Sequence, residues 1–311
     1  MNKQKINLLI LFFLIVLIIL PYFFNGYYIR LINIDGIYVL LTLGLLIVTG
    51  FTGQISFAQA AFFGIGAYTS ALFSIHTGLP FLLCLLLGGI VAAFFGLILG
   101  FPTLRLKGHY LAVVTIGFTI IIRIILLNST SVTSGAEGLK NIPYPIIFGI
   151  KINTEIRYYY LILILCILSI IFVYRIKNSR IGRALITIKQ DDLLANILGI
   201  NSFYYKMLAF ALSGFLGGIA GSLFAHYEGY LHPGSFTFLE SCKILVMLFI
   251  GGSTSVPGAI IGASLVSILP EVLRFLKDYY MAVYALALIF MMIFVPDGIV
   301  SLFNRRKINN D

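Results

Sequence analysis

Charged residues are scarce in this chain of 311 residues. They make up 10% of it, 21 Lys and Arg against 11 Asp and Glu, whereas 60% of the residues are hydrophobic. An ordinary soluble domain has about 25% charged residues. The charges are therefore too few to cover a soluble protein of this size. This excludes a soluble enzyme, a nucleic-acid-binding domain and a disordered protein.

The patterns of metal-binding and disulfide-bonded proteins are also missing. The three cysteines, Cys84, Cys166 and Cys242, lie singly in apolar stretches, and no CxxC spacing occurs. The four histidines form no HxxxH pair. Paired spacings of this kind are the usual signs of a metal site or of thiol chemistry. We therefore expect no metal ion and no bound cofactor.

Signatures of nucleotide binding and catalysis are missing as well. There is no GxxxxGK[ST] phosphate-binding loop, and the stretch Gly64–Gly66 lacks the third glycine of a dinucleotide-binding fingerprint. No Ser/His/Asp or paired-carboxylate cluster lies in an apolar run. An enzyme that acts inside a membrane would need such polar groups at that depth. We expect this chain not to be an enzyme.

Long apolar runs fill the chain instead. A transmembrane helix needs about 20 mostly apolar residues. Ten runs are candidates: Ile6–Phe24, Ile37–Thr49, Ser56–Ile75, Phe81–Phe101, Tyr110–Leu127, Tyr158–Tyr174, Met207–Tyr227, Ser241–Ser253, Ala259–Leu269 and Tyr279–Val295. The shorter ones must extend into polar residues, tilt or be broken helices packed inside protein. The sequence predicts an all-α polytopic membrane protein with eight to ten transmembrane helices, most simply ten, some of them short or broken.

The distribution of Lys and Arg predicts which side each loop faces, because cytoplasmic loops carry an excess of these residues. With a cytoplasmic N-terminus, thirteen of the 21 Lys and Arg fall on the cytoplasmic side, and two, Arg123 and Lys243, lie near outer helix ends. Six fall outside: Arg30, Lys140, Lys151, Arg157, Arg274 and Lys277. An even number of spans then places both termini in the cytoplasm. We interpret the first run as a span, since no signal-peptide cleavage site follows it before Asn25.

Two loops are long enough to carry a function. Residues 128–157 are expected outside the membrane, and residues 175–206 in the cytoplasm. In the second loop, apolar residues recur at helical spacing between Ile181 and Leu198, opposite charged residues, and Gly199 supplies a stop signal. We expect a short amphipathic helix over Arg180–Ile200. It lies either against a partner protein or against the membrane surface.

Two glycine-rich stretches, GFTGQISFAQAAFFGIGAY and GFLGGIAGS, fall in predicted spans. The second contains two small-xxx-small pairs, which let membrane helices approach closely: Gly214 with Gly218, and Gly217 with Gly221. The first carries four uncharged polar side chains: Gln54, Ser56, Gln59 and Tyr68. These four either join helices by hydrogen bonds or line a route for a translocated substrate.

Six motifs follow one another along the chain: GFTGQISFAQAAFFGIGAYTSA, LRLKGHYLAVVTIGF, TSGAEGLKNIP, RIGRALITIKQDDLLANILGIN, YKMLAFALSGFLGGIAGSLFAHYEGYLHPGSF and IGGSTSVPGAIIGA. In this order they resemble the membrane permeases of branched-chain amino acid ABC transporters, the LivM-like branch, over residues 36–300. One departure is Ala58, where the family more often has glycine. The resemblance implies a multi-pass permease of the cell membrane, in contact with lipid. It implies a single permease domain over residues 1–311, with an extracytoplasmic loop at 128–157 and a cytoplasmic coupling loop at 175–206.

The resemblance also implies partners. They are a second homologous permease, two cytoplasmic ATP-binding subunits and an extracytoplasmic substrate-binding protein, with no role for nucleic acid. The missing phosphate-binding loop agrees with ATP hydrolysis on a separate chain. Substrate is then expected to pass near Gln54, Ser56, Gln59 and Tyr68. The residues expected to couple to the ATPase are Gly182, Arg183, Leu185, Ile188, Gln190, Asp191, Leu194, Leu198 and Gly199.

Other functions stay open from the sequence. A closely similar permease branch serves urea and short-chain amides, and the sequence does not decide whether the two permeases are identical. A different class is an autonomous secondary transporter or channel. Such a protein is expected to carry Asp, Glu or Lys inside its spans. None of these residues lies away from the ends of the predicted spans.

Overall fold

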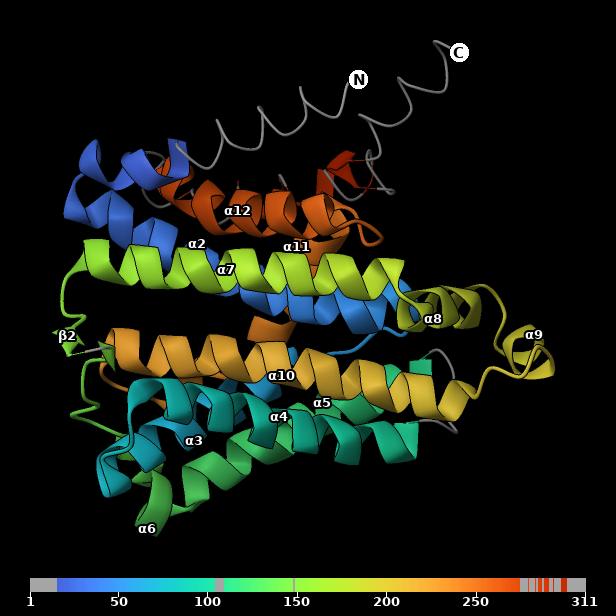
Figure 1. Cartoon of the computed structure of the whole chain (residues 1–311), viewed down its shortest axis with the longest axis horizontal. Helices are drawn as coiled ribbons and strands as arrows, with labels where there is room; N and C mark the ends of the chain where they lie inside the picture. The colour runs from blue at the N-terminus through green and yellow to red at the C-terminus, as the bar shows by residue number, and fades with distance from the viewer. Residues whose placement is uncertain are drawn as a thin grey trace.

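The computed structural model describes residues 16–103, 109–147, 149–274, 279, 283, 285–286, 288–290, 293 and 298–300. Its long helices run side by side between two ends (Figure 1). We call one the hairpin end; it holds the connections 128–155 and 228–238. The other is the α8 end, which holds residues 46–58, 178–202 and 252–255. In the predicted orientation the α8 end faces the cytoplasm.

The elements follow one another as a helical bundle with a single small hairpin. In chain order they are η1 (Leu20–Tyr22), α2 (Gly26–Leu45), the π-helical turn η2 (Leu46–Phe51), α3 (Gln59–Thr77), α4 (Phe81–Thr103), α5 (His109–Asn128), α6 (Thr130–Thr133), η3 (Gly135–Glu137), β1 (Ile146–Ile147), β2 (Ile150–Lys151), α7 (Glu155–Asn178), α8 (Arg180–Gln190), α9 (Asp192–Ile197), α10 (Ser202–Glu228), η4 (Pro233–Ser235), α11 (Phe238–Gly251) and α12 (Val256–Val272). The hairpin pairs β1 with β2 in antiparallel fashion.

Eight of the ten predicted spans overlap helices α2, α3, α4, α5, α7, α10, α11 and α12. By length and composition, six described segments can cross a membrane: Gly26–Phe51, Phe81–Phe101, His109–Asn128, Glu155–Asn178, Ser202–Glu228 and Pro233–Gly251. About half of each of the predicted spans Ile6–Phe24 and Tyr279–Val295 lies outside the described residues. A polytopic helical membrane protein is therefore supported, and the total of ten spans stays a prediction.

The start of α2 corrects one predicted span. The run Ile37–Thr49 is only the second half of a helix that begins at Gly26. Its first half contains Asp35, whose carboxylate accepts hydrogen bonds from the Ser264 and Ser267 hydroxyls of α12 at 2.8 and 2.6 Å. The expectation that no acidic residue lies inside a span is therefore wrong. The carboxyl group is accommodated there because two hydroxyl groups of another helix form hydrogen bonds with it.

Helix α10 lies at the centre of the bundle, between α2 and the pair α3 and α4 (Figure 1). Its four glycines face those neighbours so closely that a Cβ atom would collide with them. A Cβ on Gly214 would lie 2.5 Å from the Ala92 carbonyl oxygen, and one on Gly221 would lie 2.0 Å from that of Phe63. A Cβ on Gly218 would lie 2.4 Å from the Gly88 carbonyl oxygen, and one on Gly217 would lie 2.9 Å from the Phe62 Cβ.

The predicted helix Arg180–Ile200 is two helices, which corrects the sequence interpretation. Helix α8 ends at Gln190, and Asp191 has an extended backbone that turns the chain into α9. The Asp191 side chain caps α9 by accepting hydrogen bonds from the backbone N–H groups of Leu193 and Leu194, at 2.8 and 3.2 Å. A carboxylate in this position satisfies donors that have no partner within the helix. The stop after α9 is at Gly199, which has a φ of +80°.

Candidate functional site

The break between α2 and α3 is the most irregular part of the bundle at the α8 end. The helix widens into the π-helical turn η2, and the chain then runs from Gly53 to Ala58 without regular structure before α3 begins. Gly53 has a φ of +73°, which favours glycine. A Cβ on Gly50 would lie 2.3 Å from the Ser253 carbonyl oxygen, so only glycine fits there. π-Helical turns are frequent at functional sites.

The four predicted route residues do not come together. Gln54 and Ser56 lie in the break, Gln59 begins α3, and Tyr68 lies about 13 Å farther along α3 at the usual helical rise. Gln59 is buried, donates from Nε2 to the Leu41 carbonyl at 3.0 Å and accepts from the Ser213 hydroxyl at 2.9 Å. It therefore joins α3 to both α2 and α10.

Ser56 and Tyr68 are buried as well. The Ser56 hydroxyl accepts from the Ala58 backbone N–H at 3.3 Å, just before the start of α3. The Tyr68 ring packs edge-on against Phe236, and its buried hydroxyl has no hydrogen-bond partner among the described residues. Of the four, Gln54 alone lines a described cavity.

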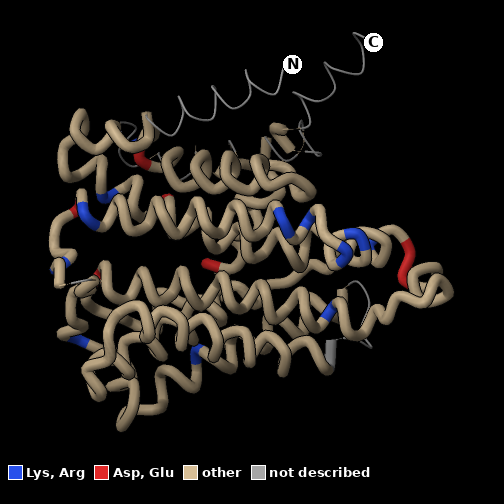
Figure 2. The backbone as a smooth tube through the Cα atoms, in the orientation of Figure 1, with Lys and Arg blue, Asp and Glu red and all other residues tan. Residues whose placement is uncertain are grey.

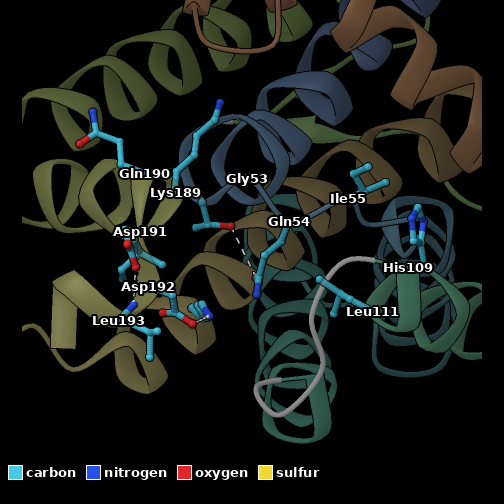
Figure 3. A pocket seen from close by; sticks show the side chains of 13 residues that line it. Gly53, Gln54, Ile55, His109, Leu111, Lys189, Gln190, Asp191, Asp192 and Leu193 are labelled. Atoms are coloured by element: carbon cyan, nitrogen blue, oxygen red, sulfur yellow. Dashed lines mark hydrogen bonds and ion pairs between the residues drawn. The ribbon is translucent and has the colours of Figure 1, made fainter.

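That cavity has a volume of about 400 Å³ and lies at the α8 end (Figure 3). It is formed by the α2–α3 break, the start of α5, the α8–α9 junction and the start of α10. Its described lining is Thr52, Gly53, Gln54, Ile55, His109, Leu111, Ile188, Lys189, Gln190, Asp191, Asp192, Leu193 and Lys206. The Lys206 ammonium and the Asp192 carboxylate form an ion pair at 2.7 Å in this wall. The two parts of the sequence assigned separately to substrate passage and to ATPase coupling thus meet at one cavity.

The predicted coupling residues fall into two groups. Leu185 and Ile188 on α8 are buried in the bundle, and a Cβ on the buried Gly182 would lie 2.3 Å from the Ile176 carbonyl oxygen. Leu194 and Leu198 are exposed. So are Arg183, Gln190, Asp191 and Gly199. Helix α8 is therefore fixed to the bundle by its apolar face, whereas the α9 segment carries exposed apolar side chains.

Lys189 was not singled out from the sequence. Its Nζ donates to the Gly50 carbonyl at 2.9 Å. Its side chain also passes close to Gly53, because a Cβ added to this glycine would lie 3.0 Å from the Lys189 Cγ. The partial burial of the side chain lowers the pKa of the Lys189 ammonium from its ordinary value. The sequence signal was its position in the last turn of the amphipathic helix, next to the apolar Ile188.

A buried Ser–His pair is the nearest approach to catalytic chemistry in the described chain. The Ser70 hydroxyl and His226 Nε2 lie 3.0 Å apart, and His226 Nδ1 lies 2.8 Å from the Pro143 carbonyl. A carbonyl only accepts, so Nδ1 carries the proton and Nε2 accepts from Ser70. Both residues are buried and the third group is a carbonyl, so the pair joins α3, α10 and the loop before β1. Within the described ranges no group of three or more His, Cys, Asp or Glu side chains could hold a metal ion.

Comparisons with known proteins agree with this architecture. Residues 27–295 match the family described as the permease component of branched-chain amino acid transport systems. The chain is 35% identical to the high-affinity branched-chain amino acid permease proteins LivM of Salmonella typhimurium and of Escherichia coli K12, over 96% of this chain and 75% of each relative. It is 26% identical to LivH of Escherichia coli K12, over 89% of this chain and 94% of that relative. No solved structure gives a significant match.

Proposed function

Because this chain belongs to the family of permease components of branched-chain amino acid transport systems, we propose that it is a membrane-spanning subunit of an importer for these amino acids. The observation that carries the proposal is the similarity to LivM, which extends over 96% of the chain. The described helices, long and apolar enough to cross a membrane, agree with this role.

The proposed assembly holds this chain, a second homologous permease, two cytoplasmic ATP-binding subunits and an extracytoplasmic binding protein. The α8–α9 region is the proposed contact with an ATP-binding subunit. It is supported by the exposed apolar side chains of Leu194, Ile197 and Leu198, which are 53%, 81% and 68% exposed. Apolar anchors of this kind dock helices into grooves of partner proteins.

The proposed route for the substrate runs along the α2–α3 break, where Gln54 lines the cavity beside α8. Gln54 supplies an uncharged polar group there, beside the charged side chains of the same lining: Lys189, Asp191, Asp192 and Lys206. Gln59, Ser56 and Tyr68 are assigned to the walls of this route, where they hold helix positions. Of the four residues predicted along the route, Gln54 lines this cavity, so it is the one proposed to face the substrate.

Reconstitution into liposomes tests the function. The complex is purified with both permeases and both ATP-binding subunits, and the binding protein is supplied outside. We expect uptake of labelled leucine, isoleucine and valine that requires ATP inside. Preferential uptake of urea or acetamide would assign the chain to the amide-transporting branch instead.

An autonomous secondary transporter is the second candidate, because Asp35 lies inside α2 and lines a cavity of about 260 Å³ between α2, α7 and α12. Ion-coupled transporters use carboxylates at such depths. The reconstituted chain without ATP-binding subunits distinguishes the two functions. Uptake driven by a proton or sodium gradient and abolished by Asp35→Asn would favour this candidate. We expect no uptake under these conditions.

A further inference from the structure

Two helix breaks meet at the α8 end. One is the α2–α3 break at residues 46–58, and the other is the turn 252–255 between α11 and α12. They lie against each other at Gly50. A Cβ added to this glycine would lie only 2.3 Å from the Ser253 carbonyl oxygen, so the two backbones are in close contact there. Carbonyls of a last helical turn lack partners within the helix. Both breaks therefore need hydrogen-bond donors from elsewhere in the fold.

Lysine side chains supply donors to both breaks. Lys189, in the last turn of α8, donates to the Gly50 carbonyl at 2.9 Å, and Lys177, in the last turn of α7, donates to the Thr254 carbonyl at 2.9 Å. A cavity of about 440 Å³ lies between them; its described lining is Gly50, Phe51, Lys177, Ile186, Lys189, Gln190 and Thr254. The amine of Lys189 thus connects α8, which belongs to the region proposed to contact the ATP-binding subunit, with the α2–α3 break that carries Gln54.

Helix α8 is well placed to pass on a displacement. Its N-terminus is capped by Ser179, whose hydroxyl accepts from the Gly182 backbone N–H at 3.3 Å. Leu185 and Ile188 are 0% and 4% exposed, so the helix moves together with the side chains around it. Lys189 follows directly after Ile188, and its stem packs against Gly53 in the break.

We propose that Lys189 is a positioning residue that ties α8 to the α2–α3 break, so that movement of α8 during ATP hydrolysis also moves the segment around Gln54. This inference rests on the proposed function, in which the α8–α9 region contacts an ATP-binding subunit. Lys189 acts through the Gly50 carbonyl and the backbone of Gly53, and it also lines the cavity that Gln54 lines.

Substitution of Lys189 tests this link in the reconstituted complex. Lys189→Met keeps the apolar stem and removes the donor. Lys189→Arg keeps a charged donor. Arg175→Met, at an exposed position in the last turn of α7, is the control for loss of one positive charge at the same end. For each variant, ATP hydrolysis, amino acid uptake, co-purification of the ATP-binding subunits and the thermal midpoint are measured.

We expect Lys189→Met to retain ATP hydrolysis and co-purification but to lower uptake per ATP by about tenfold, as for one lost hydrogen bond to a charged group. Lys189→Arg should restore most of that ratio, and Arg175→Met should match the parent. Unchanged uptake per ATP in Lys189→Met would overturn the link. So would a loss confined to co-purification or to the thermal midpoint, since docking or general stability would then explain it.

A cysteine pair gives a second, covalent test. The Cβ of Lys189 would lie 3.7 Å from a Cβ on Gly53, within the range that disulfides span. The pair Gly53→Cys and Lys189→Cys is made in a chain whose Cys84, Cys166 and Cys242 are replaced by alanine. We expect low uptake per ATP when the pair is reduced and recovery when it is oxidised. Lys189→Cys alone should stay uncoupled under the same oxidant.

The outcomes separate this inference from the proposed function. A parent complex without ATP-driven uptake would overturn the proposed function. A parent complex with normal uptake, together with normal uptake per ATP in Lys189→Met, would overturn only the role of Lys189. An oxidised pair that stays uncoupled, while Gly53→Cys alone transports like the parent, would overturn that role as well; the single variant controls for strain at this φ of +73°. If the disulfide does not form, the Met and Arg variants decide.

Discussion

Gln59 joins three helices through one amide group. It donates to the Leu41 carbonyl of α2 and accepts from the Ser213 hydroxyl of α10, and its side chain is 1% exposed. With so little exposure, water cannot replace the amide for either partner. Removal of the amide therefore takes away both hydrogen bonds, the one to the Leu41 carbonyl and the one from the buried Ser213 hydroxyl.

We expect Gln59→Leu to lower the stability of the purified protein by about 1–3 kcal/mol, the usual cost of an unsatisfied buried polar group. The thermal midpoint in detergent measures it. Gln54→Leu is the matched variant, because Gln54 is half-buried in a cavity wall. It should leave the midpoint unchanged and slow uptake. The reverse pattern, a stable Gln59 variant and an unstable Gln54 variant, would contradict both assignments.

Glycine contacts between helices give a second prediction at this scale. A Cβ on Gly66 of α3 would lie 2.3 Å from Gly218 Cα, a backbone atom that cannot swing away. Gly66→Ala should therefore destabilise the bundle by about 1–3 kcal/mol through overpacking. Gly117→Ala on α5 is the control, because no atom lies within 4 Å of its Cβ position. It should be neutral or slightly stabilising in the same thermal measurement.

Single residues show what the sequence could and could not predict about the site. Gln54, Ser56, Gln59 and Tyr68 stood out as polar residues in apolar runs. Two contacts of the site did not stand out, because their partners are far apart in the sequence. Ser213 lies 154 positions from Gln59, and Gly50 lies 139 positions from Lys189. Hydrogen bonds over such separations depend on the packing of the helices, and a periodic pattern does not encode them.

Among the elements, α8 and α9 have opposite surroundings. Leu185 and Ile188 of α8 are buried in the bundle. The larger apolar side chains of α9 and of the residue after it are exposed: Leu193, Leu194, Ile197 and Leu198. The change occurs at Asp191, where the extended backbone rotates the second helix away from the first. One amphipathic stretch in the sequence thus forms an anchor followed by a contact surface.

We expect Leu194→Glu to weaken co-purification of the ATP-binding subunits while the protein still inserts and folds. Truncation of a buried interface residue typically costs more than about 1 kcal/mol, and a buried charge costs more. Ile150→Glu, at an exposed position in β2 at the opposite end, is the matched control and should leave co-purification unchanged. Equal co-purification by both variants would remove α9 from the interface.

Helix limits were predictable where polar residues flank an apolar run, as for Phe81–Phe101 within α4 and Tyr110–Leu127 within α5. The start of α2 was not. Its first turns contain Arg30, Asn33 and Asp35, which read as a loop in the sequence. In the structure Arg30 pairs with Glu228, Asn33 donates to the Glu155 carbonyl and Asp35 accepts from two serines. Partners on other helices let these residues lie within a helix.

The whole molecule has two ends that differ in charge. Lys and Arg lie at both ends, and several of them form a cluster where α7 runs into α8 (Figure 2). At the hairpin end Arg30 pairs with Glu228 and Arg274 with Glu271, and Lys140, Lys151 and Arg157 lie there too. In the predicted topology thirteen of the 21 Lys and Arg of the sequence fall on the side of the α8 end, and cytoplasmic loops carry an excess of these residues. This asymmetry predicts that the α8 end stays in the cytoplasm, where the ATP-binding subunits are expected.

Cysteine labelling tests the sidedness of the molecule. Lys140→Cys lies at the hairpin end and Asn178→Cys at the end of α7, and both positions are exposed. In right-side-out vesicles we expect a membrane-impermeant maleimide to label position 140 and not position 178, with the reverse in inverted vesicles. Position 178 labelled from outside would place α8 and α9 beyond the reach of a cytoplasmic ATPase. The same result would remove the proposed coupling path through Lys189, because a helix on the outer side could not transmit ATP hydrolysis to the α2–α3 break.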